Sequence, residues 1–182
     1  ANELDRILRF MRTSYERSDY QAAWQSLVKD EYTINDEAVQ IAITDRNGMM
    51  ITSSVMLFPE RPIDLSDREH FTVHLNRQED ELFISRPVLG RASGKWSVQF
   101  TRPYWDRNGT FAGVIVVSLD PSHLTRAYSD LRLGEGHGLA LIGKDGIIRS
   151  GAGVLEGTLG TTEVLVRSAD PEIINGATII NK

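Results

Sequence analysis

The sequence predicts an α+β fold, with a long N-terminal helix followed by antiparallel sheet. Two observations favour it: an uninterrupted helical pattern over about residues 4–28, and three short turns that each end in Asn-Gly or Asp-Gly. Such turns between apolar or alternating runs are a strong local signal for a β-hairpin. Because hairpins join antiparallel neighbours, three of them indicate antiparallel strands with helices packed against the sheet.

The N-terminal helix is predicted from apolar residues at helical spacing, with polar residues between them and no Gly or Pro in the run. The apolar stripe consists of Leu4, Ile7, Leu8, Met11 and Tyr15. A stripe of this length suits either a helix that faces its own core or a helix that pairs with another subunit. The sequence leaves both interpretations open.

The three hairpins repeat one unit. The tetrapeptide Asp-Arg-Asn-Gly occurs at residues 45–48 and again at 106–109, and Asp145-Gly146 takes its place in the third copy. The runs beside these turns predict strands. The expected strands cover residues 39–44, 49–52, 95–104, 111–119, 139–142 and 147–148.

Further elements are expected between the hairpins. Residues 65–76 predict a short helix, with Ser66 as N-cap and Glu69 completing a capping box. Residues 82–88 predict a strand that Pro87 ends or confines to a sheet edge. A second helix is expected to open at Asp120-Pro121 and to run through Leu131.

Length and composition limit the domain count and the function classes. At 182 residues, the chain allows one domain and a fraction of another. We expect a signalling helix at 1–36, a first sheet domain at 37–133 and a smaller, incomplete unit at 134–182. The chain begins inside a helical pattern and stops just after a predicted strand, so we expect a fragment of a longer protein.

Charge and cysteine content exclude several kinds of partner and chemistry. The net charge of -5 offers no basic surface for nucleic acid or for an anionic membrane. The absence of cysteine excludes disulfides, thiolate catalysis and Cys-based metal sites. No run approaches the roughly 18 apolar residues that span a bilayer. We expect no nucleic acid partner and no cofactor.

Enzymatic motifs are weak. His70 and His74 lie four residues apart on the predicted helix near Glu69, but no persuasive third ligand accompanies them, so we expect helix histidines and no metal site. Residues 134–138 are Gly-rich but precede a strand, which favours a linker over a phosphate-binding loop. No Gly-x-Ser-x-Gly motif occurs, and the acids at 79–81 are expected to face water.

Arginine and aromatic side chains gather around the central predicted strands. Arginine binds a carboxylate through a planar fork, and aromatic rings wall a small ligand off from water. The alternative is that the aromatic residues are core and that the arginines pair with surface acids. The candidate binding residues are Arg68, His70, Phe71, Arg86, Trp96, Arg102 and Tyr104.

Five short stretches, taken in order, carry a family resemblance. They are Asp64 to Phe71, Ile84 to Val88, Ser93 to Trp96, Thr101 to Pro103, and Asn108 to Ile115. Together they resemble the double Cache domain, a tandem of PAS-like units that serves as the extracytoplasmic sensor of bacterial transmembrane receptors. The resemblance covers about residues 3–150 and depends on the order and spacing of the motifs.

The resemblance implies a specific architecture. It implies a long helix leaving one transmembrane segment, a membrane-distal PAS-like sheet that binds a small molecule, a smaller membrane-proximal PAS-like unit, and a second transmembrane segment. From Gly138 onward one hairpin and a strand at 177–180 are readable, so the second PAS-like unit is expected to be partial. Such receptors are homodimers of the inner membrane whose cytoplasmic output is a histidine kinase, a GGDEF diguanylate cyclase or a chemotaxis module.

The resemblance also bears on the ligand. Amino-acid-binding members carry Arg-x-Trp-Tyr on the short helix, an aspartate before the strand proline, and a late aspartate in the last strand. Here Arg68 matches the carboxylate-binding arginine, whereas His70 and Phe71 replace the two aromatic residues. Arg86 stands at the first aspartate position and Ser118 near the second. These replacements favour an anionic ligand such as a carboxylate over an α-amino acid.

The expected function is therefore a non-catalytic, periplasmic or extracellular ligand sensor that signals through its N-terminal helix. An alternative from another class is a protein-interaction module that uses the PAS-like sheet as a docking surface and binds no small molecule. A small hydrolase would require a serine or an acid pair that converges with a histidine.

Overall fold

The computed structural model describes residues 2–17, 38–55, 59–75, 79–126 and 137–162. The chain forms two compact units, Ala1–Leu119 and Asp120–Lys182. The domain boundaries predicted at 36/37 and 133/134 involve residues outside the described ranges. In the described part of the chain, no helix is long and apolar enough to cross a membrane.

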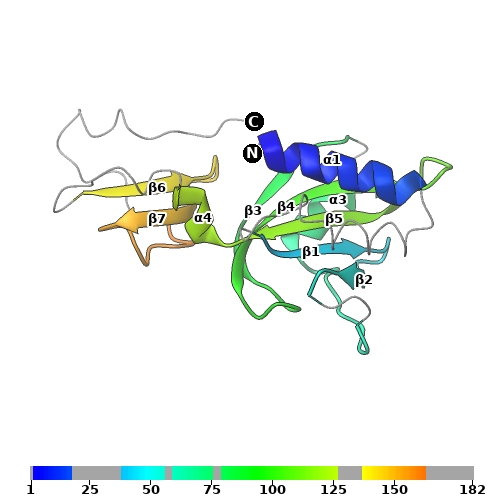
Figure 1. Cartoon of the computed structure of the whole chain (residues 1–182), viewed down its shortest axis with the longest axis horizontal. Coiled ribbons are helices and arrows are strands. Elements are labelled where there is room, and N and C mark those ends of the chain that lie inside the picture. The colour runs from blue at the N-terminus through cyan, green and yellow to red at the C-terminus, as the bar shows by residue number, and fades with distance from the viewer. Residues whose placement is uncertain (1, 18–37, 56–58, 76–78, 127–136, 163–182) are drawn as a thin grey trace. The chain divides into compact units, whose positions relative to one another are not determined.

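The described part of the first unit contains an antiparallel five-stranded sheet in the order β2-β1-β5-β4-β3 (Figure 1). This confirms the predicted α+β class, and β3 lies at a sheet edge as its proline indicated. The strands are β1 (Ala38–Thr44), β2 (Met50–Ser53), β3 (Phe83–Leu89), β4 (Trp96–Trp105) and β5 (Phe111–Leu119).

The two Asp-Arg-Asn-Gly turns join β1 to β2 and β4 to β5 as predicted. Their aspartates close the turns: Asp45 Oδ1 accepts from the N–H groups of Asn47 and Met49, each at 2.9 Å, and Asp106 repeats the pattern. Gly48 has a φ of +82°, a backbone conformation that favours glycine. Both ends of the tetrapeptide are therefore required by the turn.

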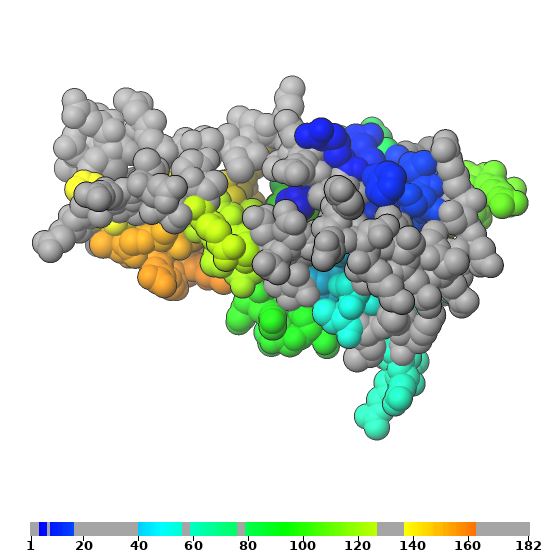
Figure 2. Space-filling view, in the orientation of Figure 1, coloured from blue at the N-terminus to red at the C-terminus, as the bar shows by residue number. Residues whose placement is uncertain are grey.

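The helix α1 (Asn2–Arg17) packs on β4 and β5. Leu8 and Met11 of the predicted stripe are fully buried, so the described part of this helix faces its own core. The outward side of α1, blue in Figure 2, lies at the surface. The remainder of the helix predicted to residue 28 lies outside the described residues.

The short helix α3 (Glu69–Leu75) begins later than predicted. The proposed capping box is wrong: Asp64 Oδ1 accepts from the Ser66 N–H at 2.8 Å, and the Glu69 carboxylate binds Arg86. The chain therefore turns at residues 64–68 and enters the helix only afterwards.

The two faces of the sheet contact different helices, because successive side chains of a strand point to opposite sides. On β4, Thr101 contacts His74 of α3, whereas the next residue, Arg102, contacts Asp5 of α1. We call these sides the α3 face and the α1 face. The α3 face includes Gln40, Ala42, Gln99, Thr101, Val116 and Ser118, and the α1 face includes Val98, Phe100, Arg102 and Tyr104.

The apolar core of the α3 face lies between the sheet and α3. It consists of Ala42, Met50, Leu65, Phe71, Val114 and Val116. Near this core the sheet strands approach closely at Gly113, which has a φ of +152°. A Cβ atom on Gly113 would lie 2.0 Å from the Thr44 carbonyl oxygen, so only glycine fits there.

The described part of the second unit contains α4 (Pro121–Arg126) and the predicted third hairpin, β6 (Gly138–Ile142) with β7 (Ile148–Gly153). Asp145 in the turn binds Arg149 through two hydrogen bonds of 3.0 and 2.9 Å. Thr125 of α4 lies 3.1 Å from the Ser150 hydroxyl of β7. The strand predicted at 177–180 lies outside the described residues.

Candidate ligand-binding site

A concavity opens on the α3 face of the first unit. It has an empty volume of about 380 Å³, part of which is open to solvent. Its walls come from all five strands, from the start of α3 and the segment before it, and from the loop after β3. The described residues that line it are Gln40, Ala42, Met50, Leu65, Arg68, His70, Val88, Leu89, Gly90, Arg91, Ala92, Gln99, Val116 and Ser118.

Two arginines line the concavity, and their partners differ. Arg91 donates two hydrogen bonds to the Asp67 carboxylate, at 2.6 and 2.7 Å, so its charge is already matched. Arg68 donates to the Leu89 carbonyl at 3.1 Å and has no carboxylate partner among the described residues. A guanidinium has five N–H donors, so Arg68 retains donors for a carboxylate from a ligand.

His70 is a buried polar wall of the same concavity. It is 5% exposed, and its Nδ1 has no hydrogen-bond partner among the described residues. Burial, together with the positive charges of Arg68 and His74, lowers the pKa of His70 to about 4. The imidazole is therefore neutral near pH 7 and offers one donor and one acceptor nitrogen.

A pair of neutral side chains on neighbouring strands completes the polar lining. Gln99 of β4 and Ser118 of β5 are directly opposite each other in the sheet. The Ser118 hydroxyl donates to Gln99 Oε1 at 2.6 Å, and Gln99 Nε2 donates to the Ser97 hydroxyl at 2.8 Å. This chain of hydrogen bonds orients both groups within the concavity.

The structure thus brings together three of the sequence-predicted residues: Arg68, His70 and Ser118. Phe71 is buried in the adjoining core, where its ring packs edge-on against Phe111 at 6.0 Å. Trp96 is 56% exposed at the start of β4. Neither residue is among those that line the concavity.

Arg86 also lies away from the concavity. Its side chain is 55% exposed and forms two hydrogen bonds with Glu69, at 2.9 and 3.2 Å. Its predicted role in ligand binding stays a prediction, and the contacts of the described residues place it in a surface ion pair.

Arg102 and Tyr104 lie on the α1 face, across the sheet from the concavity. Tyr104 donates to the Thr44 carbonyl at 2.9 Å and packs edge-on against Tyr15 of α1 at 5.1 Å. The Arg102 side chain is only 4% exposed, and its Nε donates to Asp5 of α1 at 2.5 Å. Both residues therefore fasten α1 to the sheet.

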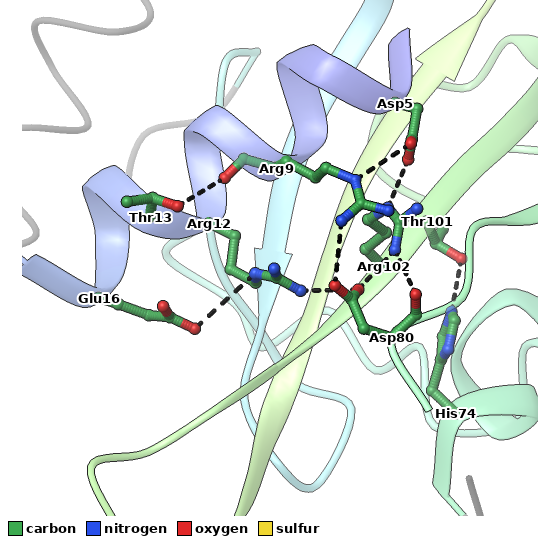
Figure 3. Close-up of polar contacts among 9 residues, drawn as sticks. All are labelled: Asp5, Arg9, Arg12, Thr13, Glu16, His74, Asp80, Thr101 and Arg102. Carbon is green, nitrogen blue, oxygen red and sulfur yellow. Dashed lines mark hydrogen bonds and ion pairs between the residues drawn. The ribbon is translucent and has the colours of Figure 1, made fainter. Parts of the chain in front are cut away.

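Asp80 is the centre of this charged cluster (Figure 3). Its carboxylate lies 2.5 Å from Arg102 Nη1, 2.7 Å from Arg12 Nη1 and 3.5 Å from Arg9 Nη1. Burial raises the pKa of Asp80, but the hydrogen bonds from Arg12 and Arg102 outweigh it and hold the pKa below its usual value. We call Asp5, Arg9, Arg12, Asp80 and Arg102 the α1 clamp.

His74 lies on the α3 face, against the strand that carries Arg102 of the α1 clamp. It lies one helical turn after His70 on α3 and is buried, with its Nε2 2.8 Å from the Thr101 hydroxyl (Figure 3). Thr101 is next to Arg102 in β4, and Asp80 follows α3 in the chain. The helix that lines the concavity and the cluster that holds α1 are thus separated by one strand.

The described residues contain no group of three or more His, Asp or Glu side chains that is arranged to hold a metal ion. His70 and His74 serve different contacts: His70 lines the concavity, and His74 binds Thr101.

Gln40, Gln99 and Arg91 line the concavity but are absent from the sequence-based candidates. The alternation of β4 does separate Gln99 from Arg102. For Gln40, a polar residue in the otherwise apolar run at 38–43 was the available signal, because buried polar side chains require partners. Arg91 lies in the turn after β3, and nothing in the sequence alone marked it.

Comparisons with known proteins agree with this architecture. A family model described as Cache domain, of the dCache_1 type, matches residues 1–181. Among solved structures, the extracellular domain of the histidine kinase candidate rpHK1S-Z16 is 25% identical, with a TM-score of 0.68, over 88% of this chain and 64% of that one.

Two chemoreceptor domains share the fold at lower identity. The ligand-binding domain of the Pseudomonas aeruginosa PAO1 amino acid chemoreceptor PctC, solved with GABA, has a TM-score of 0.65 at 16% identity and covers 97% of this chain and 77% of that one. The ligand-binding domain of Pseudomonas fluorescens CtaA, solved with L-serine, has a TM-score of 0.64 at 17% identity and covers 82% and 63%.

The chain therefore spans less than two thirds of the rpHK1S-Z16 and CtaA domains. A comparison with curated proteins found no match. Cache domains of receptors are extracytoplasmic sensors and in general are not catalysts. The family model, which covers nearly the whole sequence, and the PAS-like sheet with its N-terminal helix together show that this chain belongs to the Cache domain family.

Proposed function

We propose that the chain is the ligand-sensing part of a bacterial transmembrane receptor, lies on the periplasmic or extracellular side of the inner membrane, and binds a small carboxylate in the concavity. The observation that carries the ligand class is Arg68, a guanidinium in the wall with no carboxylate partner among the described residues. A ligand carboxylate would exchange its hydration for charge-assisted hydrogen bonds to this group.

The surroundings of Arg68 suit a small organic acid. Leu65, Val88 and Val116 supply apolar wall, and the polar groups of Gln99 and Ser118 lie in the same concavity. Ligand sites generally combine an apolar lining with a few fixed polar groups. GABA and L-serine, which occupy the domains of PctC and CtaA, are themselves carboxylates.

For the signal, we propose that ligand binding changes the position of α3 and that the α1 clamp passes this change to α1. The contacts that support this route are His74 with Thr101 on the α3 face, and Arg102 with Asp5 and Asp80 on the α1 face. A ligand that prefers one of two arrangements shifts their populations. Pairing of α1 helices in a homodimer and the identity of the cytoplasmic output stay predictions.

The test is a thermal-shift screen of the purified chain against small carboxylates, followed by titration calorimetry. A ligand that binds only the folded state raises the melting temperature by a mass-action effect. Arg68→Ala should raise the Kd about 10- to 100-fold, because a hydrogen bond to a charged group contributes about 1.5–3 kcal/mol. Arg107→Ala, in the exposed β4–β5 turn, is the matched control.

Arg86→Ala tests the remaining arginine candidate in the same assay. An unchanged Kd would indicate that Arg86 only forms a surface ion pair with Glu69. A raised Kd would indicate that Arg86 contributes to ligand binding. A carboxylate ligand that binds Arg68→Ala as well as it binds the original chain would refute the assignment of the pocket. No shift with any carboxylate would favour a docking module.

A further inference from the structure

We infer that the second polar group of the ligand is uncharged, such as a hydroxyl or a carbonyl, and that the concavity excludes a ligand ammonium group. This inference rests on the proposed carboxylate site around Arg68. It separates this chain from a receptor for α-amino acids, which carry an ammonium beside the carboxylate.

The first observation is the charge of the lining. Among the described residues that form the walls, the charged side chains are Arg68 and Arg91, and none is Asp or Glu. An ammonium that leaves water needs a negative partner, because burying an unpaired charge is costly. Asp67, the acid that pairs with the wall residue Arg91, already uses both of its carboxylate oxygens in that contact.

The second observation is the hydrogen-bonding capacity of the Gln99 and Ser118 pair. The Ser118 proton is directed to Gln99 Oε1, so the Ser118 oxygen retains lone pairs for a donor from a ligand. A ligand hydroxyl satisfies such an acceptor without bringing a charge. The amide of Gln40 lines the same concavity and contacts the Met50 sulfur at 3.7 Å, so it too is a neutral group.

The third observation is the buried Nδ1 of His70, which has no partner among the described residues. A buried polar atom without a partner is costly, and a ligand group that pairs with it recovers that cost. A hydroxyl pairs with either tautomer of the imidazole, and a carbonyl pairs with the N–H tautomer.

The lowered pKa of His70 indicates that its surroundings disfavour a positive charge. Its pKa is lowered first by burial and then by the charges of Arg68, His74 and Arg91, while Asp67 opposes them. The same cations act on an ammonium in the concavity. A site that keeps its own histidine neutral therefore disfavours a cationic ligand group.

The experiment compares matched ligands that differ only in this group. Titration calorimetry is run with glycolate and glycine, L-lactate and L-alanine, and L-2-hydroxyisovalerate and L-valine. We expect at least one hydroxy acid to bind at least 10-fold more tightly than its amino acid. An amino acid that binds as tightly as its hydroxy acid, or more tightly, overturns the inference and leaves the carboxylate site standing. Binding by no member of either series overturns both.

A gain-of-charge variant gives an independent test. Gln99→Glu has nearly the same shape and places a carboxylate in the wall, so the ratio of amino-acid to hydroxy-acid affinity should rise at least 10-fold. Asn47→Asp, at the exposed β1–β2 turn, is the matched control and should leave the ratio unchanged. If Gln99→Glu does not fold, Ser118→Asp places the charge on the neighbouring strand. An unchanged ratio in the variant that folds refutes the inference.

Discussion

Replacing Asp80 tests whether the α1 clamp holds the helix on the sheet. In Asp80→Ala, Arg102 loses an oxygen at 2.5 Å and Arg12 loses one at 2.7 Å. Arg102 keeps Asp5 but is 4% exposed, so water cannot fully replace the lost partner. The change therefore leaves a buried cation with half of its former negative charge.

The expected cost follows from this burial. Removing one partner of a buried ion pair costs about 3–5 kcal/mol, and hydrogen bonds to charged groups contribute about 1.5–3 kcal/mol each. Because Asp5 remains and Asp80 is itself 30% exposed, we expect less than the full cost of breaking a buried ion pair, about 2–3 kcal/mol. Asp80→Asn keeps the shape of the side chain and loses its charge, so its free energy of unfolding should lie between those of Asp80→Ala and the unsubstituted chain.

The assay is urea unfolding followed by tryptophan fluorescence. All three tryptophans, Trp24, Trp96 and Trp105, lie in the first unit, so the signal reports that unit alone. Trp105 lies under Arg12, with the guanidinium carbon 5.9 Å from the ring centroid, and senses whether α1 is docked. With a slope of about 2 kcal/mol per molar urea, the midpoint should fall by about 1–1.5 M.

The matched control is Asp67→Ala, which breaks an equally close arginine pair at the surface. Arg91 and Asp67 are 39% and 62% exposed, so this change should cost about 1 kcal/mol or less. If Asp80→Ala lowers the free energy of unfolding no more than Asp67→Ala does, the buried position of Arg102 does not strengthen the α1 clamp. That result would also contradict the proposed route of the signal.

Three further predictions concern the sheet and α3. Gly113→Ala should lower the free energy of unfolding by about 3 kcal/mol or more in thermal unfolding, because its Cβ would collide with the Thr44 carbonyl. Gly109→Ala is the control, because no atom lies within 4 Å of its Cβ, and it should cost about 1–2 kcal/mol. Equal costs for the two variants would contradict the close approach at Gly113. Between pH 6.5 and about 4 the unfolded chain binds a proton on residue 70 that folded His70 does not bind, so the unfolding free energy should fall by up to about 3 kcal/mol as the pH drops through this window. His70→Gln should flatten that part of the profile, and an unchanged slope would show that His70 is not its source. Thr101→Val should cost about 1–3 kcal/mol because it removes the hydroxyl bound to His74, whereas Thr110→Val in the exposed turn should be nearly neutral in the same urea titration.

The strands were predictable from the sequence because each depends on local chemistry. The Asp-Arg-Asn-Gly turns carry their own closing groups, and the period-2 alternation of a strand places Gln99 and Arg102 of β4 on opposite faces. Local patterns do not fix where a helix begins, and α3 starts at Glu69 because Asp64, not Ser66, supplies the acceptor at the preceding turn.

The candidate site was only partly predictable, since it depends on which face of the sheet each helix covers. Arg68 and His70 lie at the start of α3 and Ser118 lies in β5, and these two segments meet only after β5 inserts between β1 and β4. Arg102 looked like a ligand arginine because its partners, Asp5 and Asp80, are 97 and 22 residues away in the chain. No spacing rule connects residues so far apart.

The order of the strands has a mechanical consequence. The first strand of the sheet starts at Ala38 and the last strand ends at Leu119, and these two residues are paired with each other. Because β1 and β5 are antiparallel, a force that pulls the chain apart at Ala38 and Leu119 loads one rung of the ladder at a time. The sheet would open like a zipper from that end, while the turns at the opposite end stay unloaded. Tension between the segments that flank the sheet is therefore resisted by the few backbone hydrogen bonds at one end of the β1–β5 ladder.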